Sequence, residues 1–192
     1  MQASPLALPE VIEIVSNKYE DQRGFFSETY NQHRFHEAGI RLTWVQDNHS
    51  HSVLRGTLRG LHFQIPPFAQ DKLVRVVRGA IFDVAVDIRR GSPRFGRWCS
   101  CVISAERWNQ ILVPKGFAHG FVTLEPNTEV IYKVSEFYDR DHDRAINYAD
   151  SDVGIDWPLD GDLLLSDKDR AAPHLCDVDT GFTYEADGGA TI

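Results

Sequence analysis

LVRVVRGAIFDVAVDIRRGSPRFGRWCSCVIS, residues 73–104, is the stretch that decides the fold. Along it, β-branched and other apolar residues alternate with polar ones, a pattern typical of strands with one buried face. Gly79 and the Gly91-Ser92-Pro93 sequence interrupt the alternation with residues that favour turns. The stretch therefore predicts a run of strands joined by turns.

The same pattern continues further along the chain. Residues 110–138, QILVPKGFAHGFVTLEPNTEVIYKVSEFY, alternate around Pro114-Lys115-Gly116 and around Glu125-Pro126-Asn127. Turn signals that recur about every 8 to 12 residues are typical of an antiparallel sandwich or barrel. Helical spacing is scarce, and its best example is YNQHRFHEAG at 30–39, which predicts a short helix ended by Gly39. We predict an all-β fold with a few short helices.

Length and composition indicate how the chain is organised. With 192 residues, 42% hydrophobic and 25% charged, it suits one globular domain with a core between about residues 10 and 170. Residues 1–9 contain two prolines, and the stretch EADGGATI at 185–192 is Gly-rich, so both ends are expected to be flexible. The charged stretch DLLLSDKDRAAP at 162–173 is, by composition alone, typical of a solvated loop.

Charge and cysteine content exclude several classes of partner. The net charge of -8 repels nucleic acids and anionic membranes, so an anionic ligand requires a local basic pocket. No apolar run of about 18 residues occurs, and MQASPLALPE lacks the features of a signal peptide, which predicts a cytoplasmic protein. Cys99 and Cys101 lie two apart in a predicted strand, a spacing that disfavours a disulfide, so we interpret them as buried thiols.

Two spacings resemble the motifs of the cupin family. Gly56, His62, Phe63, Gln64, Lys72 and Gly79 follow its first motif, and Pro114 to His119, PKGFAH, follows its second. The resemblance implies an antiparallel jelly-roll β-barrel, in whose mouth cupins hold a divalent metal with three histidines and a glutamate. Here Gln64 replaces the second histidine and Lys72 replaces the glutamate. A cation at a carboxylate position repels a metal, so we expect no metal but a pocket suited to an anion or a developing negative charge.

A second sequence that could contribute metal ligands is weaker evidence for a metal site. His49-Ser50-His51 would place two imidazoles on one face of a strand, but no third ligand lies beside them in the sequence. The surrounding residues QDNHSHS are polar, so we interpret this stretch as an exposed loop or the end of a strand.

Several longer motifs, in order, closely resemble the dTDP-4-dehydrorhamnose 3,5-epimerase family over residues 10–170. They are DQRGFFSE (21–28), VQDNHSHS (45–52), LRGLHFQIPPFAQDKLVRVVRG (58–79), FDVAVDIRRGSPRFGRW (82–98), VPKGFAHGF (113–121), EVIYKVSEFY (129–138) and SDKD (166–169). The resemblance implies proton removal and opposite-face return at C3 and C5 beside a C4 ketone. That chemistry requires a base, an acid and a stabilised enolate oxygen, without a metal or redox cofactor.

The resemblance implies four catalytic residues. His62 matches the base, and the reference pKa of an imidazole, about 6.5, suits proton abstraction near neutral pH. Asp169 corresponds to the carboxylate that pairs with His62 and sets its tautomer. Tyr132 aligns with the proton donor, and Lys72 with the partner of the C4 oxygen. By position alone, His62 and Tyr132 would be interpreted as packing residues of strands.

The resemblance also implies a binding site for dTDP-4-dehydro-6-deoxy-sugars. Residues that match contacts to the diphosphate or sugar are Arg23, Arg59, His119 and Lys168. Residues that match positions lining the ligand are Glu28, Gln46, Asp47, Asn48 and Asp143. Tyr138 matches the aromatic that stacks on thymine.

The family also implies a homodimer, in which an N-terminal segment reaches the neighbouring subunit. Arg23 and Glu28 would then act across the interface. Three alternatives stay open: an epimerase acting at one carbon, a sugar-nucleotide-binding cupin without chemistry, and a metal-dependent cupin, which Gln64 and Lys72 disfavour.

One stretch poses a geometric problem. In LRGLHFQ, residues 58–64, Arg59 and His62 lie three apart, so a regular strand points them to opposite faces. Because the resemblance requires both at one ligand, we expect a bulge or twist at Gly60, or an arginine that curls round the strand end.

Overall fold

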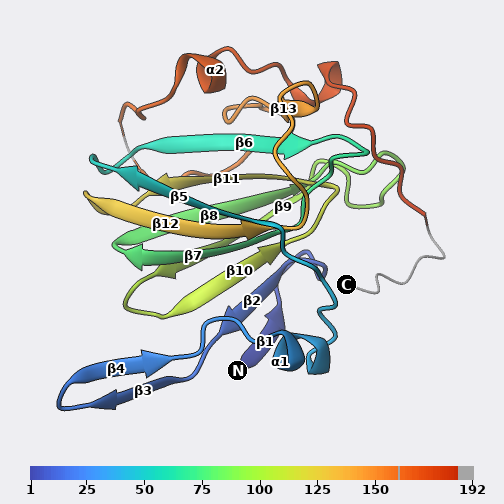
Figure 1. Cartoon of the computed structure of the whole chain (residues 1–192). Coiled ribbons are helices and arrows are strands. Elements are labelled where there is room, and N and C mark those ends of the chain that lie inside the picture. The colour runs from blue at the N-terminus through green and yellow to red at the C-terminus, as the bar shows by residue number, and fades with distance from the viewer. Residues whose placement is uncertain (160, 186–192) are drawn as a thin grey trace.

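Two antiparallel β-sheets packed face to face form the body of the chain in the computed structural model, which describes residues 1–159 and 161–185. The six-stranded sheet has the order β1-β2-β10-β7-β12-β5, and the five-stranded sheet has the order β13-β6-β11-β8-β9. Figure 1 shows the two sheets stacked, with the hairpin of β3 and β4 projecting at the lower left. The fold is a cupin-type jelly-roll β-barrel, as the sequence predicts.

The elements have the following bounds. The strands are β1 (Gln2–Pro5), β2 (Ile12–Val15), β3 (Lys18–Asp21), β4 (Gly24–Ser27), β5 (Gln46–Ser52), β6 (Leu58–Gln64), β7 (Lys72–Arg78), β8 (Ala80–Asp87), β9 (Trp98–Ser104), β10 (Asn109–Val113), β11 (Phe117–Thr123), β12 (Thr128–Val134) and β13 (Asp143–Ala145). The helices are α1 (Gln32–Glu37), α2 (Asp167–Arg170) and the 3-10 helix η1 (Leu175–Asp177).

The stretch 73–104 forms β7, β8 and β9, with turns where the sequence predicts them. Val74 and Val76 from β7 and Ile81 from β8 point into the space between the sheets and belong to one buried cluster. Gly79, between β7 and β8, has φ +78, and a Cβ there would lie 2.4 Å from Thr128 Oγ1. Alternation thus turns one face of each strand toward the space between the sheets, and glycine permits the close turn.

A second buried cluster covers the outer face of the five-stranded sheet. Val84 and Val86 of β8 pack there against Val153 and Leu175 from the irregular C-terminal part of the chain. β8 is therefore buried on both faces, unlike a strand of a sheet that faces water. The covering segment also contains α2 and brings it against β6, as the top of Figure 1 shows.

Two expectations for the N-terminal half require correction. Residues 2–5 are not flexible: they form β1, which pairs with β2, and Leu8 is buried. His49 and His51 do not lie in a loop but in β5, exposed on its outer face, since the whole of 46–52 pairs with β12. Helix α1 forms as predicted, capped by Asn31, with Phe35 buried. The predicted flexible tail from residue 186 onward lies outside the described residues.

Cys99 and Cys101 are unpaired and buried, as their spacing in the sequence predicts. Cys99 and Cys101 are buried free thiols, and burial raises their pKa values to about 11 and about 12, whereas Cys176 is exposed. Within residues 1–159 and 161–185, no helix is long and apolar enough to cross a membrane.

Candidate active site

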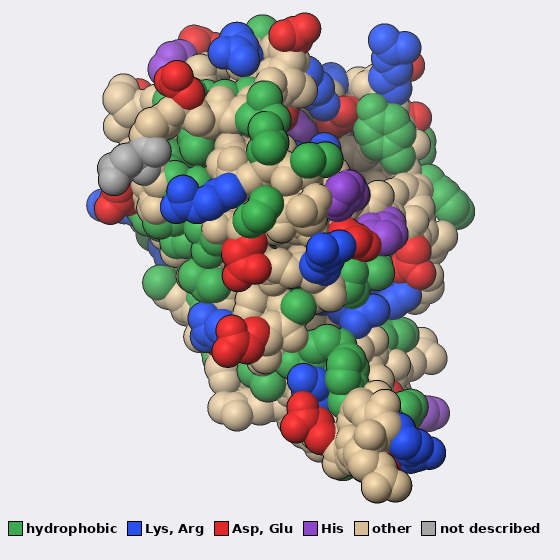
Figure 2. Space-filling model, turned by 90° about the vertical axis from the view of Figure 1, so that its left-hand side faces the viewer, with side chains coloured by type: hydrophobic (Ala, Val, Ile, Leu, Met, Phe, Trp, Pro, Cys, Tyr) green, Lys and Arg blue, Asp and Glu red, His purple; other side chains and the backbone are tan. Residues whose placement is uncertain are grey.

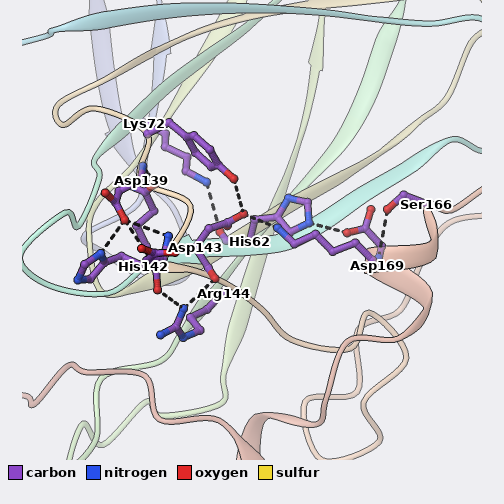
Figure 3. Close-up of polar contacts among 12 residues, drawn as sticks. His62, Lys72, Asp139, His142, Asp143, Arg144, Ser166 and Asp169 are labelled. Atoms are coloured by element: carbon purple, nitrogen blue, oxygen red, sulfur yellow. Dashed lines mark hydrogen bonds and ion pairs between the residues drawn. The ribbon is translucent and has the colours of Figure 1, made fainter.

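His62 and Asp169 form the centre of the candidate site. His62 lies on β6, and its Nε2 is 2.5 Å from Asp169 Oδ1 (Figure 3). Asp169 is only 3% exposed, in helix α2, whose N-cap Ser166 accepts a hydrogen bond from the Asp169 backbone N–H. Burial disfavours the carboxylate, but the hydrogen bond and charge of His62 outweigh it, so the pKa of Asp169 lies below its ordinary value.

This contact fixes the tautomer that the neutral imidazole of His62 adopts. An ionised Asp169 only accepts hydrogen bonds, so it holds a proton on His62 Nε2. In the neutral imidazole, Nδ1 is then the nitrogen that can accept a proton from a substrate. The pair therefore has the arrangement of a general base oriented by a carboxylate.

Lys72, at the start of β7, supplies a partly buried cation beside the dyad. Its Nζ donates a hydrogen bond to the His62 carbonyl oxygen at 3.2 Å. Burial lowers the pKa of Lys72 to about 8, against the opposing effect of the Asp143 and Asp83 carboxylates. The amine is still largely protonated at neutral pH, so it can stabilise an oxyanion that forms in the cavity.

Tyr132 enters the same cavity from the other sheet. It lies on β12, between Val74 of β7 and Asn48 of β5, whereas His62 belongs to the five-stranded sheet. Burial raises the pKa of its phenol above the ordinary value, so the phenol keeps its proton at neutral pH. A base and a potential acid thus project from opposite sheets into one space.

A bulge in β6 brings Arg59 into the cavity that contains His62. On β11, the residues opposite Arg59 and His62 are Phe121 and His119, which are two apart, so β6 has one extra residue in this interval. The extra residue places Arg59 and His62 on the same side, and both line the cavity. Gly60 permits this, since it has φ +123 and a Cβ there would lie 2.6 Å from Gly120 Cα. The expected irregularity at Gly60 is confirmed.

A second histidine-carboxylate pair lies beside the first. His119 is the cross-strand neighbour of His62, and its Nε2 is 3.0 and 2.9 Å from the two Asp83 oxygens. Both side chains are buried, and His119 lines the cavity. Sequence reasoning missed Asp83; the signal that could have indicated it is a carboxylate within the otherwise apolar strand FDVAVD.

The main cavity has a volume of about 400 Å³, and a smaller one of about 160 Å³ shares three lining residues with it. His62, Lys72 and Tyr132 line both, whereas Arg59, His119, Lys168 and Asp169 line only the larger. The smaller cavity is lined by four more of the predicted residues, Gln46, Asn48, Tyr138 and Asp143. Gln46 donates to Asn48, Tyr138 to Asp143, and Lys168 forms an ion pair with Asp143.

Three of the predicted site residues line neither of these two cavities in the single chain. Asp47 lies on the opposite face of β5 from Gln46 and Asn48 and forms an ion pair with Lys133, because alternate residues of a strand face opposite ways. Within one chain, Asp47 therefore lies on the face of β5 away from the cavity. Arg23 pairs with Asp21 in the projecting hairpin, and Glu28 pairs with Arg34, so neither approaches His62.

Within the part of the chain that the structure describes, His, Cys, Asp and Glu side chains form no group of three or more that could hold a metal ion. At the cupin metal position, Lys72 contributes a cation, and the Gln64 side chain is bonded to backbone groups of two loops. Fold and site together define the class: a cupin-type barrel built for acid-base chemistry around a stabilised negative charge.

Comparisons with known proteins identify the family within this class. The sequence pattern of the dTDP-4-dehydrorhamnose 3,5-epimerase family matches residues 5–177. The dTDP-4-dehydrorhamnose 3,5-epimerase of Pseudomonas aeruginosa is 51% identical over 180 residues, which are 93% of this chain and 98% of that protein. The chain belongs to the dTDP-4-dehydrorhamnose 3,5-epimerase family and is an isomerase.

Solved structures agree with this assignment. The 3,5-epimerase of Legionella pneumophila, solved in complex with dTDP-4-keto-L-rhamnose, is 42% identical and superposes with a TM-score of 0.92 over 96% of this chain and 99% of its own. A 3'-monoepimerase of Streptomyces bikiniensis, in complex with dTDP-quinovose, is 36% identical with a TM-score of 0.85 over 90% of this chain and 87% of its own.

Proposed function

We propose that the chain converts dTDP-4-dehydro-6-deoxy-D-glucose to dTDP-4-dehydro-L-rhamnose by epimerisation at C3 and C5. The observation that carries this proposal is the His62–Asp169 pair, 2.5 Å apart, in one cavity with Lys72 and Tyr132. These side chains are a base, its orienting carboxylate, a cation and a protonated phenol, which together match the requirements of enolate chemistry.

The steps follow from the positions of these groups. The C4 ketone makes the hydrogens at C3 and C5 acidic, and Nδ1 of His62 removes one of them. The electron pair of the broken C–H bond forms a C=C bond to C4, and the charge moves to the C4 oxygen, which Lys72 stabilises. Tyr132 donates its proton to the opposite face of the carbon, after which water reprotonates Tyr132 and removes the proton from His62. Only protons move, so the reaction itself requires no redox cofactor.

The nucleotide is assigned to the remaining side chains of the two cavities. Arg59, His119 and Lys168 line the larger cavity and can pair with the negative charge of a diphosphate. Tyr138, 57% exposed beside the smaller cavity, offers its ring for stacking on thymine. These basic groups supply the local attraction that a chain of net charge -8 requires for an anionic ligand.

Isotope exchange tests the proposed reaction. In heavy water, the enzyme is expected to introduce deuterium from solvent at both C3 and C5 of dTDP-4-dehydro-6-deoxy-D-glucose, because each inversion returns a proton from a solvent-exchanged donor. NMR of the recovered sugar measures the label at each carbon. Competition by other nucleoside diphosphates in a dTDP binding assay measures the nucleotide preference.

The second candidate function is epimerisation at a single carbon. The likeness to the 3'-monoepimerase of Streptomyces bikiniensis favours it, since an enzyme of that specificity shares the fold at 36% identity. Label at only one carbon would move the assignment to this function. Binding of dTDP without any exchange would indicate a sugar-nucleotide-binding protein without chemistry.

We infer that the working form is a homodimer in which the β3–β4 hairpin of one subunit reaches the other. In the single chain this hairpin projects from the barrel (Figure 1) and exposes Tyr19, Phe25 and Phe26 at 54%, 52% and 69%. Figure 2 shows the side of the molecule from which the hairpin projects, where apolar, basic, acidic and histidine side chains are interspersed. Exposed apolar side chains on a projecting element favour burial against a partner.

Mixing two variants tests whether Arg23 acts on the partner's site. Arg23→Ala and His62→Ala are each expected to lower activity strongly. If Arg23 acts across the interface, each mixed dimer contains one intact site, and a mixed preparation should recover up to about a quarter of the wild-type activity. Light scattering should give twice the 21.8 kDa chain mass. A monomer, or a mixture with no recovered activity, would contradict the inference.

We also infer a cytoplasmic location. Cys99 and Cys101, two residues apart in β9, are free thiols, as expected in a reducing compartment. The exposed Cys176 is also free, and such a thiol is best kept reduced in the same compartment.

A further inference from the structure

Gln64 replaces a metal-ligand histidine of the cupin motif, and its side chain has a defined set of partners. It is the last residue of β6 and is 4% exposed. Its Nε2 donates to the carbonyl oxygens of Phe68 at 2.6 Å and Phe137 at 3.0 Å, and its Oε1 accepts from the Asp139 backbone N–H at 2.7 Å. Both amide hydrogens are thus occupied by backbone groups of two loops.

The partners of Gln64 flank Tyr138 on both sides. Gln64 binds the residue before Tyr138 and the residue after it, while Gln46 accepts a hydrogen bond from the Tyr138 backbone N–H at 3.3 Å. Gln70 donates to the Glu136 carbonyl oxygen at 2.8 Å. Three glutamine side chains therefore hold the backbone of residues 136–139, although these residues belong to no helix or strand.

This arrangement decides how the Tyr138 ring is presented. The ring is 57% exposed, so side-chain packing alone does not fix its direction. Its hydroxyl donates to Asp143, and Asp143 is the cross-strand partner of Gln64 itself. A ring that is held in place before binding loses less conformational entropy when a base stacks on it.

We propose that Gln64 is a positioning residue for the nucleobase end of the site: it anchors residues 136–139 and so orients Tyr138 for stacking. The inference rests on the proposed function, because it takes the stacking partner to be the base of a dTDP-sugar. Gln64 acts through Tyr138 and not on the reacting carbons, so its loss should weaken nucleotide binding while the proton transfers continue.

Gln64→Glu is the sharpest test, because it keeps the shape and the acceptor but removes both N–H donors and places a negative charge beside two carbonyl oxygens. In the absence of ligand, amide hydrogen exchange should rise in peptides covering 66–71 and 136–140. The Kd of dTDP should rise about 10-fold, of the order of a lost stacking contact. The kcat at saturating substrate should stay within about twofold. Gln64→Met makes the same test without the charge, and circular dichroism confirms folding of both.

A double-mutant cycle separates positioning from general destabilisation. In a Tyr138→Ala background, Gln64→Glu should change the Kd of dTDP by less than about twofold, because the ring it orients is absent. Gln110→Glu is the matched control: Gln110 is also 4% exposed and also uses its amide nitrogen for two hydrogen bonds, but to Ser16 and Thr29. Any effect of this control on dTDP binding should persist in the Tyr138→Ala background.

Several results would overturn the inference. Unchanged exchange in 136–140, an effect of Gln64→Glu that persists in the Tyr138→Ala background, or a fall in kcat with an unchanged Kd would each do so. These outcomes are independent of the proposed reaction. A wild-type protein that binds dTDP without epimerising the sugar would contradict the reaction, yet the cycle would still decide the role of Gln64. A wild-type protein that does not bind dTDP would overturn both.

Discussion

His62→Ala is expected to lower deuterium exchange at both C3 and C5 by more than about 10³-fold, since general-base removal commonly costs 10²- to 10⁴-fold. The Kd of dTDP should stay within about twofold, because Arg59, Lys168 and Tyr138 are unchanged. His62 Nε2 is bound to Asp169, and Nδ1 is the nitrogen left to accept the substrate proton. Exchange measured by NMR and dTDP binding measured by calorimetry give the two readouts.

His174→Ala is the matched control for this variant. His174 also forms a pair with an aspartate, Asp150, at 3.2 Å, but it lies before η1 and does not line either cavity of the site. The deuterium exchange catalysed by the His174→Ala variant should remain near that of the wild type. Substantial exchange by His62→Ala would contradict the assignment of the base.

Lys72→Met is expected to lower kcat by about 10²- to 10³-fold, the usual cost of removing a group that stabilises an oxyanion. The stability of the folded Lys72→Met variant should not fall, although its activity does. Because burial lowers the pKa of Lys72 from 10.5 to about 8, the unfolded chain binds a proton that the folded chain lacks between these values. At neutral pH the buried cation therefore opposes folding, and the apolar substitute removes that cost. A lower melting temperature with unchanged kcat would indicate a structural lysine.

The same amine should limit activity at alkaline pH. As the pH rises through about 8, Lys72 loses its proton, and kcat should fall because the C4 oxygen loses its cationic partner. Lys72→Arg keeps a charge throughout this range, so its alkaline decline should move to higher pH even if its maximum rate is lower. A pH profile of kcat in both proteins measures the shift, and identical alkaline limbs would contradict this role for Lys72.

Much of the fold could be predicted because its cause is local. Alternation in 73–104 and 110–138 depends on neighbouring residues only, and it gave the strands β7 to β12 and their turns. The N-terminal strand β1 was missed because a short edge strand with a proline has weak local preference and forms by pairing with β2. For QDNHSHS the sequence left open an exposed loop or the end of a strand, and pairing with β12 over all of 46–52 decides for the strand.

The residues of the site also divide into those that the local sequence can indicate and those that only contacts between distant segments bring together. Motif resemblance could indicate Asp169, but composition alone places it in a solvated loop, because nothing local shows that it meets His62 from 107 residues away. The face of Arg59 depends on a bulge whose extra residue is defined only by the register against β11. Asp83 was missed because its partner His119 lies on another strand.

The sequence by itself determined the strands from β7 to β12, the cupin motif spacings, the replacement of metal ligands by Gln64 and Lys72, and the family. The tertiary structure decided which groups share a cavity: His62 with Asp169, Arg59 on the same side as His62, and Asp47 on the opposite face of β5. The physical reason is that alternation acts between neighbours, whereas register, bulges and packing between sheets join residues far apart in the chain.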